Sequence, residues 1–338
     1  MWNEAKLDAL LTQPSERLIA DMRRIQGNIM VIGAGGKMGP TLCVLAQRAM
    51  QAAGCAGHVI AVSRFSDPFA SQLLEKYGVE TIAADVMQEG ALERLPDCEN
   101  VIYMIGRKFG TNGSEYQTWA SNVVLPVRVA NRFRDSRIVV FSSGNIYPML
   151  DARSGGATEA TRPDPMGEYA MSCLGRERVF ENASRAYGTR VLIYRLNYAV
   201  DLRYGVLYDI ASAVHAGRPV SLGSAAFNCI WQGDACEYAI RGLLLAESPM
   251  RILNVTGPET LSVRAVAERF AREFGVEAVF EGEMGDRSLL SNSGACMKAL
   301  GYPAVCADQM IQWQSEWIAE GGRSLAKPTH FETRDGKY

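Results

Sequence analysis

The stretch PMGEYAMSCLGRE, residues 165–177, contains side chains that are able to move a proton. Tyr169 lies where a helix is expected to begin, and Cys173 follows one turn later. A free tyrosine has a pKa of about 10, so about one phenol in a thousand is ionised at pH 7. A nearby cation lowers that pKa, whereas a neutral thiol does not. A catalytic role for Tyr169 therefore requires positive charge from another residue or from a ligand.

The chain around this stretch alternates short apolar runs with amphipathic segments. Most segments between the runs have helical patterns, including those at about 115–133 and 169–188. Continuous apolar strands linked by helices predict a parallel sheet covered on both faces, which is a Rossmann-type doubly wound α/β fold. Its ligands are expected at the carboxyl ends of the strands. The predicted strands up to residue 200 are NIMVIGAGG, HVIAVSR, VETIAAD, NVIYMIG, RIVVFSS and RVLIYRLN, and ILNVTG is expected to return to the sheet.

The pattern also divides the chain into regions. Residues 1–26 form a predicted helical extension, and residues 27–200 a dinucleotide-binding domain to which residues 226–256 return. Residues 201–225 and 257–323 are expected to form a smaller C-terminal substrate-binding lobe. The polar tail, residues 324–338, is expected to be loosely held.

Three glycines follow the first predicted strand. Gly33, Gly36 and Gly39 are spaced three residues apart in IGAGGKMG, and a helix with Pro40 in its first turn comes next. In this context glycines permit a tight turn and let the backbone approach a pyrophosphate, which the helix N-terminus attracts. The loop therefore predicts a dinucleotide cofactor.

The end of the second predicted strand bears on which dinucleotide binds. This strand ends at Ser63 and Arg64, where an acidic residue would hold the ribose 2′-hydroxyl of NAD. A hydroxyl and a guanidinium suit a 2′-phosphate, so NADP is favoured and NAD stays possible. The alternative is that Arg64 is a solvated charge at the end of a strand.

Several motifs in order make residues 28–320 resemble the extended short-chain dehydrogenase/reductase family, the NAD-dependent epimerases and dehydratases. GAGGKMG fits the family's G-x-x-G-x-x-G loop, and ADV contains Asp85 at the position beside the adenine ring. Asn122 fits the helix asparagine before the fifth strand. FSSGNIYP resembles F-x-S-S-x-x-V-Y-G, and PMGEYAMSC fits P-x-x-x-Y-x-x-S-K up to its last residue.

The resemblance implies roles for the residues at these positions. Tyr169 transfers a proton to or from a substrate hydroxyl while hydride moves to or from the nicotinamide, and Ser143 holds the substrate oxygen. The family lysine, which lowers the tyrosine pKa and binds the nicotinamide ribose, is replaced by Cys173. The expected cofactor contacts are Gly33, Gly36, Lys37, Met38, Gly39, Ser63, Arg64, Asp85, Val86, Ile105, Gly106, Asn122, Tyr169 and Cys173, and the substrate candidates are Asn145, Asn197 and Tyr198.

Three basic residues are candidates for a substitute cation. Arg176 lies two helical turns from Tyr169 on the same face, and Arg107 and Lys108 follow the fourth predicted strand. The alternative for Arg176 is a solvated charge on the helix surface. Two further possibilities stay open: the oxidised nicotinamide supplies the positive charge, or catalysis is lost and nucleotide binding remains.

Departures from the family pattern bear on the substrate. Nucleotide-sugar enzymes of the family usually carry an arginine about where this chain has Phe227, and RLNYAVDLRYG lacks the Gly-Pro of R-x-x-N-x-x-G-P. These departures favour a small sugar, sugar acid or lactone. The chain is thus predicted to be an NAD(P)-dependent oxidoreductase or epimerase. The alternatives are a catalytically impaired NAD(P)-binding sensor or scaffold, and a nucleotide-sugar epimerase or dehydratase.

Composition narrows the expected partners. The chain has 338 residues, 48% of them hydrophobic, and a formal net charge of −2. This balance gives no electrostatic reason to expect nucleic acid or a membrane surface, and no stretch approaches the roughly 20 apolar residues of a spanning helix. Eight scattered cysteines and three distant histidines predict free thiols in a cytoplasmic setting and no metal site. A homodimer through the helices bearing Asn122 and Tyr169 is a further expectation from the family.

Overall fold

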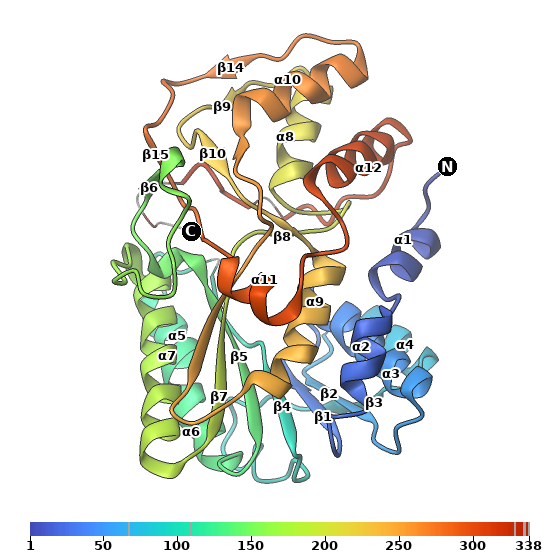
Figure 1. Ribbon diagram of the computed structural model, residues 1–338, viewed down its shortest axis with the longest axis vertical. Helices are drawn as coiled ribbons and strands as arrows, with labels where there is room; N and C mark the ends of the chain where they lie inside the picture. Colours follow the sequence, from blue (N-terminus) through green and yellow to red (C-terminus); the bar gives the residue numbers. More distant parts are fainter. Residues whose placement is uncertain (67, 109, 328, 334–335, 337–338) are drawn as a thin grey trace.

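The computed structural model describes residues 1–66, 68–108, 110–327, 329–333 and 336. At its centre lies a seven-stranded parallel sheet (Figure 1) with the strand order β12-β7-β5-β4-β1-β2-β3. Strand β1 lies between β2 and β4, so the strand order reverses there, which is where doubly wound sheets bind dinucleotides. The predicted doubly wound α/β fold is therefore confirmed. The strands are β1 (Ile29–Ile32), β2 (Val59–Ser63), β3 (Glu80–Ala83), β4 (Asn100–Tyr103), β5 (Arg137–Ser143), β7 (Arg190–Leu196) and β12 (Arg251–Val255).

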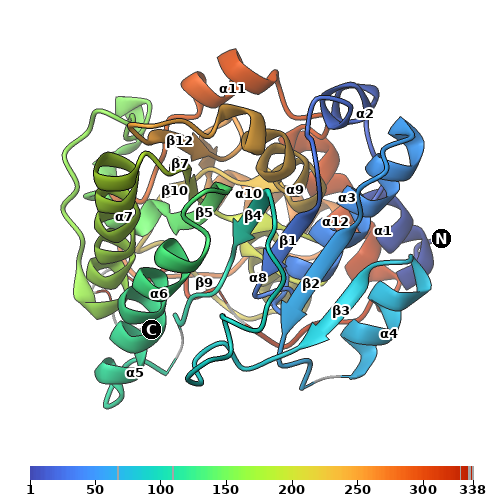
Figure 2. The same ribbon diagram turned by 90° about the horizontal axis from the view of Figure 1, so that it is seen from below.

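Helices cover both faces of the sheet (Figure 2). Side chains of β1 alternate between two apolar clusters: Val31 packs with the helices of one face, whereas Met30 and Ile32 pack with those of the other. The first face carries α2 (Glu16–Met22), α3 (Gly39–Ala53), α4 (Pro68–Lys76) and α9 (Gln232–Arg241). The second carries α5 (Glu115–Trp119), a π-helical segment (Ala120–Val124), α6 (Leu125–Arg132) and α7 (Gly167–Tyr187).

The helix predicted over about 115–133 contains an irregular segment. Its middle is π-helical and ends just before Pro126, which lies in the first turn of α6 and has no backbone N–H to donate. This segment contains Asn122, which is fully buried.

A second lobe lies at one end of the sheet, beyond the ends of β5 and β7 (Figure 1). It has its own apolar core, formed largely by α8 (Val206–His215), α10 (Val263–Phe274) and α12 (Ala307–Ala319). Short strand pairs lie outside the seven-stranded sheet, and α11 (Gly294–Leu300) packs against β12. The pairs are β8 (Ala199–Val200) with β11 (Ile230–Trp231), β9 (Val220–Ser221) with β14 (Phe280–Glu281), β10 (Ala226–Phe227) with β13 (Leu261–Ser262), and β6 (Leu150–Asp151) with β15 (Arg287–Ser288).

The N-terminal extension forms two helices, α1 (Glu4–Leu11) and α2. Leu7 and Leu11 of α1 join the core of the second lobe, whereas Leu18 and Met22 of α2 join the core of the sheet.

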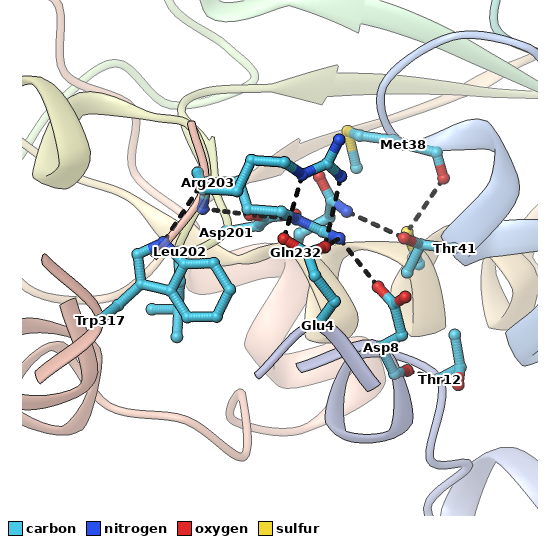
Figure 3. A network of polar contacts seen from close by, with 12 residues as sticks. Glu4, Asp8, Thr12, Met38, Thr41, Asp201, Leu202, Arg203, Gln232 and Trp317 are labelled. Atoms are coloured by element: carbon cyan, nitrogen blue, oxygen red, sulfur yellow. Dashed lines mark hydrogen bonds and ion pairs between the residues drawn. The ribbon is translucent and has the colours of Figure 1, made fainter. Parts of the chain in front are cut away.

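One arginine ties α1 to the second lobe. Figure 3 shows Arg203 reaching Asp201 and, on α1, Glu4 at 2.8 Å and Asp8 at 2.9 Å. The extension therefore packs on the body of its own chain and links its two parts. Among the described residues, no helix is both long and apolar enough to span a membrane.

Candidate cofactor and active site

The glycine loop between β1 and α3 makes close contacts that side chains at two of its positions would block. Gly33 has φ +98°, and a side chain there would lie 3.0 Å from the backbone nitrogen of Ile105. A Cβ on Gly39 would lie 2.2 Å from the carbonyl oxygen of Ala34, so this glycine lets α3 pack on the loop. Gly36 differs, because its added Cβ would meet only the Gly33 oxygen, at 3.5 Å. The protein's own packing does not require glycine at position 36, and its absent side chain leaves room for a ligand, as a dinucleotide needs.

Two neighbouring pockets open beside this loop. The first has a volume of about 700 Å³ and the second about 340 Å³, both in the range of small-molecule sites. They share the lining residues Gly33, Gly36, Met104, Gly106 and Lys108, so one extended ligand can pass from the first to the second.

The first pocket collects the residues expected around the adenosine half of the cofactor. Arg64 is exposed at its edge, and Asp85 accepts a hydrogen bond from the backbone of Met87 at 3.1 Å. The expected cofactor contacts in its lining are Gly33, Gly36, Ser63, Arg64, Asp85, Val86, Ile105 and Gly106. The structure therefore brings together residues from the ends of β1, β2, β3 and β4.

The second pocket collects the residues expected around the nicotinamide and the substrate. The expected site residues in its lining include Lys37, Met38, Gly39, Lys108, Ser143, Asn145, Tyr169, Arg176, Asn197 and Tyr198. Asn197 donates to Asn228 Oδ1 at 2.8 Å, and Tyr198 adopts a left-handed backbone with φ +46°. A non-glycine residue in this region is uncommon and often marks a functional site.

Two expected cofactor contacts line neither pocket. Asn122 bonds the backbone of Arg107, accepting from its N–H at 2.8 Å and donating to its carbonyl at 3.1 Å, and it also donates to Ser172. Its side chain thus holds the loop after β4. Cys173 is buried in a small apolar cluster that Tyr169 packs against. Both residues support the pocket wall from behind.

Ser143 and Tyr169 meet in the second pocket. Ser143 ends β5, and Tyr169 lies in the first turn of α7. Both line the second pocket, and Tyr169 packs against the small cluster that contains Cys173. Ser143 Oγ donates to Asn145 Oδ1 at 3.0 Å. Burial raises the pKa of Tyr169 well above its usual value, and the positive charge of Arg176 opposes that rise. The phenol is therefore protonated at neutral pH.

Arg176 is not the solvated helix charge that the sequence left open. It is 4% exposed, and its Nη1 donates to the carbonyl of Phe141 at 2.7 Å. Its Nε and Nη2 have no hydrogen-bond partner among the described residues. A Cβ on Gly106 would lie 2.9 Å from Nη2, so this nitrogen lies against the wall shared by the two pockets.

The other two candidate cations are placed differently. The guanidinium of Arg107 bonds the side chain of Gln117 and the carbonyl of Gly110, which lie beside α5. Lys108 Nζ lies 5.8 Å from the centre of the Tyr169 ring and donates to the carbonyl of Thr329 at 3.4 Å. Arg176 and Lys108 therefore face the second pocket, and Arg107 does not line it.

Sequence reasoning missed a buried polar network behind the pocket. Arg195 donates two hydrogen bonds to Glu177, and Ser142 Oγ donates to the same carboxylate at 2.5 Å. Arg195 also donates to Tyr147, whose hydroxyl donates to Asn254. The sequence contained one signal for this network. Glu177 and Arg195 carry opposite charges, and they lie on a helix and a strand that were both expected to pack in the interior.

The C-terminal tail also differs from its prediction. Thr329 is buried, and its N–H and Oγ1 donate to Asp209 Oδ2 at 2.8 Å and 2.5 Å. It lines the second pocket, so this part of the tail is held rather than loose. The last residues, 334–335 and 337–338, lie outside the described residues. Within the described residues no group of His, Cys, Asp and Glu side chains could hold a metal ion.

Comparison with known proteins agrees with this architecture. Residues 29–220 match the model of the NAD dependent epimerase/dehydratase family. No curated protein sequence matches the chain.

Solved structures similar to this chain include several sugar-nucleotide enzymes. UDP-glucuronic acid 4-epimerase from Bacillus cereus, in complex with NAD, has a TM-score of 0.71 at 15% identity, covering 87% of this chain and 99% of that one. DesIV, a dTDP-glucose 4,6-dehydratase from Streptomyces venezuelae with NAD and TYD bound, has a TM-score of 0.72 at 18% identity, covering 87% and 97%. UDP-glucose 4-epimerase from Thermus thermophilus, in complex with NAD, has a TM-score of 0.69 at 18% identity, covering 86% and 99%. At these identities the likeness establishes the fold alone.

Proposed function

The chain belongs to the NAD dependent epimerase/dehydratase family, and we propose that it is an NAD(P)-dependent oxidoreductase or epimerase of a small carbohydrate-like alcohol or ketone. One observation carries this proposal: Ser143 and Tyr169 line one pocket, and that pocket continues into the glycine loop. The residues present fit a dinucleotide, because Gly36 has no side chain and so leaves space for a ligand beside the first pocket. The bound nicotinamide supplies the hydride chemistry.

The chain's own residues move the proton and hold the substrate. A protonated Tyr169 gives its phenolic proton to the oxygen of a ketone as that oxygen gains negative charge. In the opposite direction the phenolate takes the proton of an alcohol. The hydroxyl of Ser143, which lines the same pocket, holds the same substrate oxygen within reach of Tyr169.

Arg176 takes over the two tasks of the family lysine. Its charge opposes the effect of burial on the Tyr169 pKa, which makes the phenolate more accessible. Its Nη2 lies beside Gly106 and has no partner among the described residues, so it can donate to a ribose hydroxyl of the cofactor. A buried guanidinium with unused donors is costly, and a bound ligand would remove that cost.

The phosphorylated cofactor is the favoured one. Ser63 and Arg64 both line the first pocket, where a hydroxyl and an exposed guanidinium can bind a 2′-phosphate. NAD remains a possible cofactor, and the three similar solved structures contain NAD.

Two other functions each have an observation in their favour. The buried Cys173 in place of a lysine favours a protein that binds the cofactor without hydride transfer. The similarity to sugar-nucleotide enzymes favours a nucleotide-sugar substrate. Against the latter, Phe227 is buried in the second lobe, and Phe331 and Thr333 of the tail line a third pocket beside Asn145 and Tyr198.

A single assay separates these functions. The protein is incubated with each oxidised and reduced cofactor and a panel of sugars, sugar acids, lactones and UDP-sugars, and both nicotinamide absorbance and product stereochemistry are followed. Turnover of a small carbohydrate that Tyr169→Phe abolishes supports the proposal. Cofactor binding without turnover of any substrate favours the impaired protein, and turnover of UDP-sugars alone favours the nucleotide-sugar enzyme.

A further inference from the structure

The wall of the second pocket is strongly basic. Lys37 from the glycine loop, Lys108 from the loop after β4 and Arg176 from α7 all line it. None of the described residues that line this pocket is an aspartate or a glutamate. Neutral hydroxyl groups of a sugar do not require such a wall, whereas anions do, both the cofactor pyrophosphate expected beside Lys37 and a charged substrate.

Lys37 and Lys108 lie in surroundings that lower their pKa and so disfavour their charged forms. Burial is the main cause that lowers the pKa of Lys37 to about 8, and Lys327 and Lys108 add repulsion that Asp209 partly offsets. Burial also lowers the pKa of Lys108 to about 8, against the opposing effects of Cys173 and Glu332. Lys37 Nζ also lies 3.4 Å from the centre of the Tyr204 ring, which the cation faces.

Acidic groups near the lysines come from outside the pocket wall. Asp209 of α8 is engaged by Thr329, which donates to it from both its N–H and its hydroxyl. Thr329 in turn closes the pocket beside Lys108, whose Nζ donates to its carbonyl. Thr329 therefore engages the Asp209 carboxylate and lines the pocket beside Lys108.

We propose that the second pocket binds an anionic carbohydrate, a sugar acid or sugar phosphate, whose charged group contacts Lys37 and Lys108 while a hydroxyl or carbonyl reaches Tyr169. The short separation between Lys108 and the Tyr169 ring allows one monosaccharide to make both contacts. This inference rests on the proposed function for the part played by Tyr169. It narrows the substrate from small carbohydrates in general to those that carry a negative charge.

Binding calorimetry on the full chain saturated with cofactor tests the proposal. The probes are glucuronate, gluconate and glucose 6-phosphate, with neutral glucose as the comparison at matched ionic strength. At least one anion is expected to bind more tightly than glucose. Comparing the two carboxylates, glucuronate and gluconate, with glucose 6-phosphate shows which charged group the pocket prefers. Lys37→Met and Lys108→Met are each expected to weaken that binding by about ten- to a hundredfold, whereas Lys298→Met on the exposed face of α11 leaves it unchanged.

A second readout follows from the lysine pKa values. Bound anion favours the charged lysines, so binding near pH 8 takes up protons, and affinity falls as pH rises through about 8 because the lysines lose their charge. Repeating the titration in two buffers of different ionisation enthalpy measures this uptake. Glucose is expected to show none.

The outcomes separate this proposal from its alternatives. Equal affinity for glucose and for every anion, or no binding of any probe anion, overturns it. Lysine variants that lose cofactor affinity and leave anion affinity unchanged also overturn it, because the lysines then serve the pyrophosphate. A protein that binds the anions through both lysines but never exchanges hydride supports the anion site and contradicts the proposed function.

Discussion

Glu177 of α7 and Arg195 of β7 form a two-pronged ion pair in the protein interior, with hydrogen bonds of 3.0 Å and 2.7 Å. Ser142, the neighbour of Ser143, donates to the same carboxylate. The Glu177 carboxylate therefore connects α7, the helix that carries Tyr169, to β7 through Arg195 and to β5, the strand that carries Ser143, through Ser142. These bonds hold α7 against the end of β5, next to Ser143.

Glu177→Ala is expected to lower the free energy of unfolding by about 3–5 kcal/mol, because it leaves Arg195 buried without its partner. Urea or thermal denaturation measures the change. Glu181→Ala on the same helix removes a carboxylate that pairs with two exposed arginines, and should cost no more than about 1 kcal/mol. Equal losses for the two variants would contradict a structural role for the buried pair.

Gly36→Ala and Gly39→Ala separate ligand binding from folding. The methyl group at position 36 meets only the Gly33 oxygen, in ordinary contact at 3.5 Å, so stability should change by less than about 1 kcal/mol. Cofactor affinity should fall, because the methyl occupies the phosphate cradle. At position 39 it collides with the Ala34 carbonyl, so the fold itself should lose about 1–3 kcal/mol. Denaturation and cofactor titration are measured for both. Undiminished cofactor affinity in a folded Gly36→Ala protein would argue against pyrophosphate binding at this loop.

Arg64→Ala tests the choice of cofactor. Loss of a charge-assisted bond to the 2′-phosphate should weaken NADP binding by about ten- to a hundredfold and leave NAD binding unchanged. Fluorescence titration with both reduced cofactors gives the two affinities, and Arg162→Ala, an exposed arginine elsewhere, is the control. If wild-type protein prefers NAD, the assignment of Arg64 to the phosphate is wrong.

Arg176→Met should slow turnover and move the pH dependence. Without this cation the pKa of Tyr169 rises further, so oxidation of an alcohol, which needs the phenolate, requires a higher pH. Arg176→Lys is expected to retain part of the activity. Adding Cys173→Lys to Arg176→Met places an ammonium one turn from Tyr169 and should move the pH profile back, a result that a purely structural role for Arg176 does not produce.

How far the sequence predicts this molecule depends on the kind of evidence each residue offers. The sheet and the glycine loop were predictable, because β1 and its neighbours are short apolar runs and Gly33, Gly36 and Gly39 lie between an apolar strand and a helix. The burial of Arg176 was not, because spacing along α7 gives the face of a residue and not the depth to which its side chain reaches. Only the fold brings its guanidinium to the carbonyl of Phe141 on β5.

The tail illustrates a second limit. Polar composition predicts weak attachment, but Thr329 is held by Asp209, 120 positions earlier in the chain. Asn122 shows another limit: the motif predicts a cofactor contact, whereas the side chain lines neither of the two pockets. Its bonds to Arg107 show that it positions a loop, which the motif alone does not reveal.

The structure of the protein with bound cofactor tests the central claim most directly. The quantity to measure is the position of the nicotinamide ring relative to the phenolic oxygen of Tyr169. We expect the ring to lie in the second pocket between Gly106 and Ser143, in contact with Tyr169, with Arg176 donating to the adjoining ribose. A nicotinamide ring bound away from Tyr169, or a protein that takes up neither NAD nor NADP, would contradict the claim.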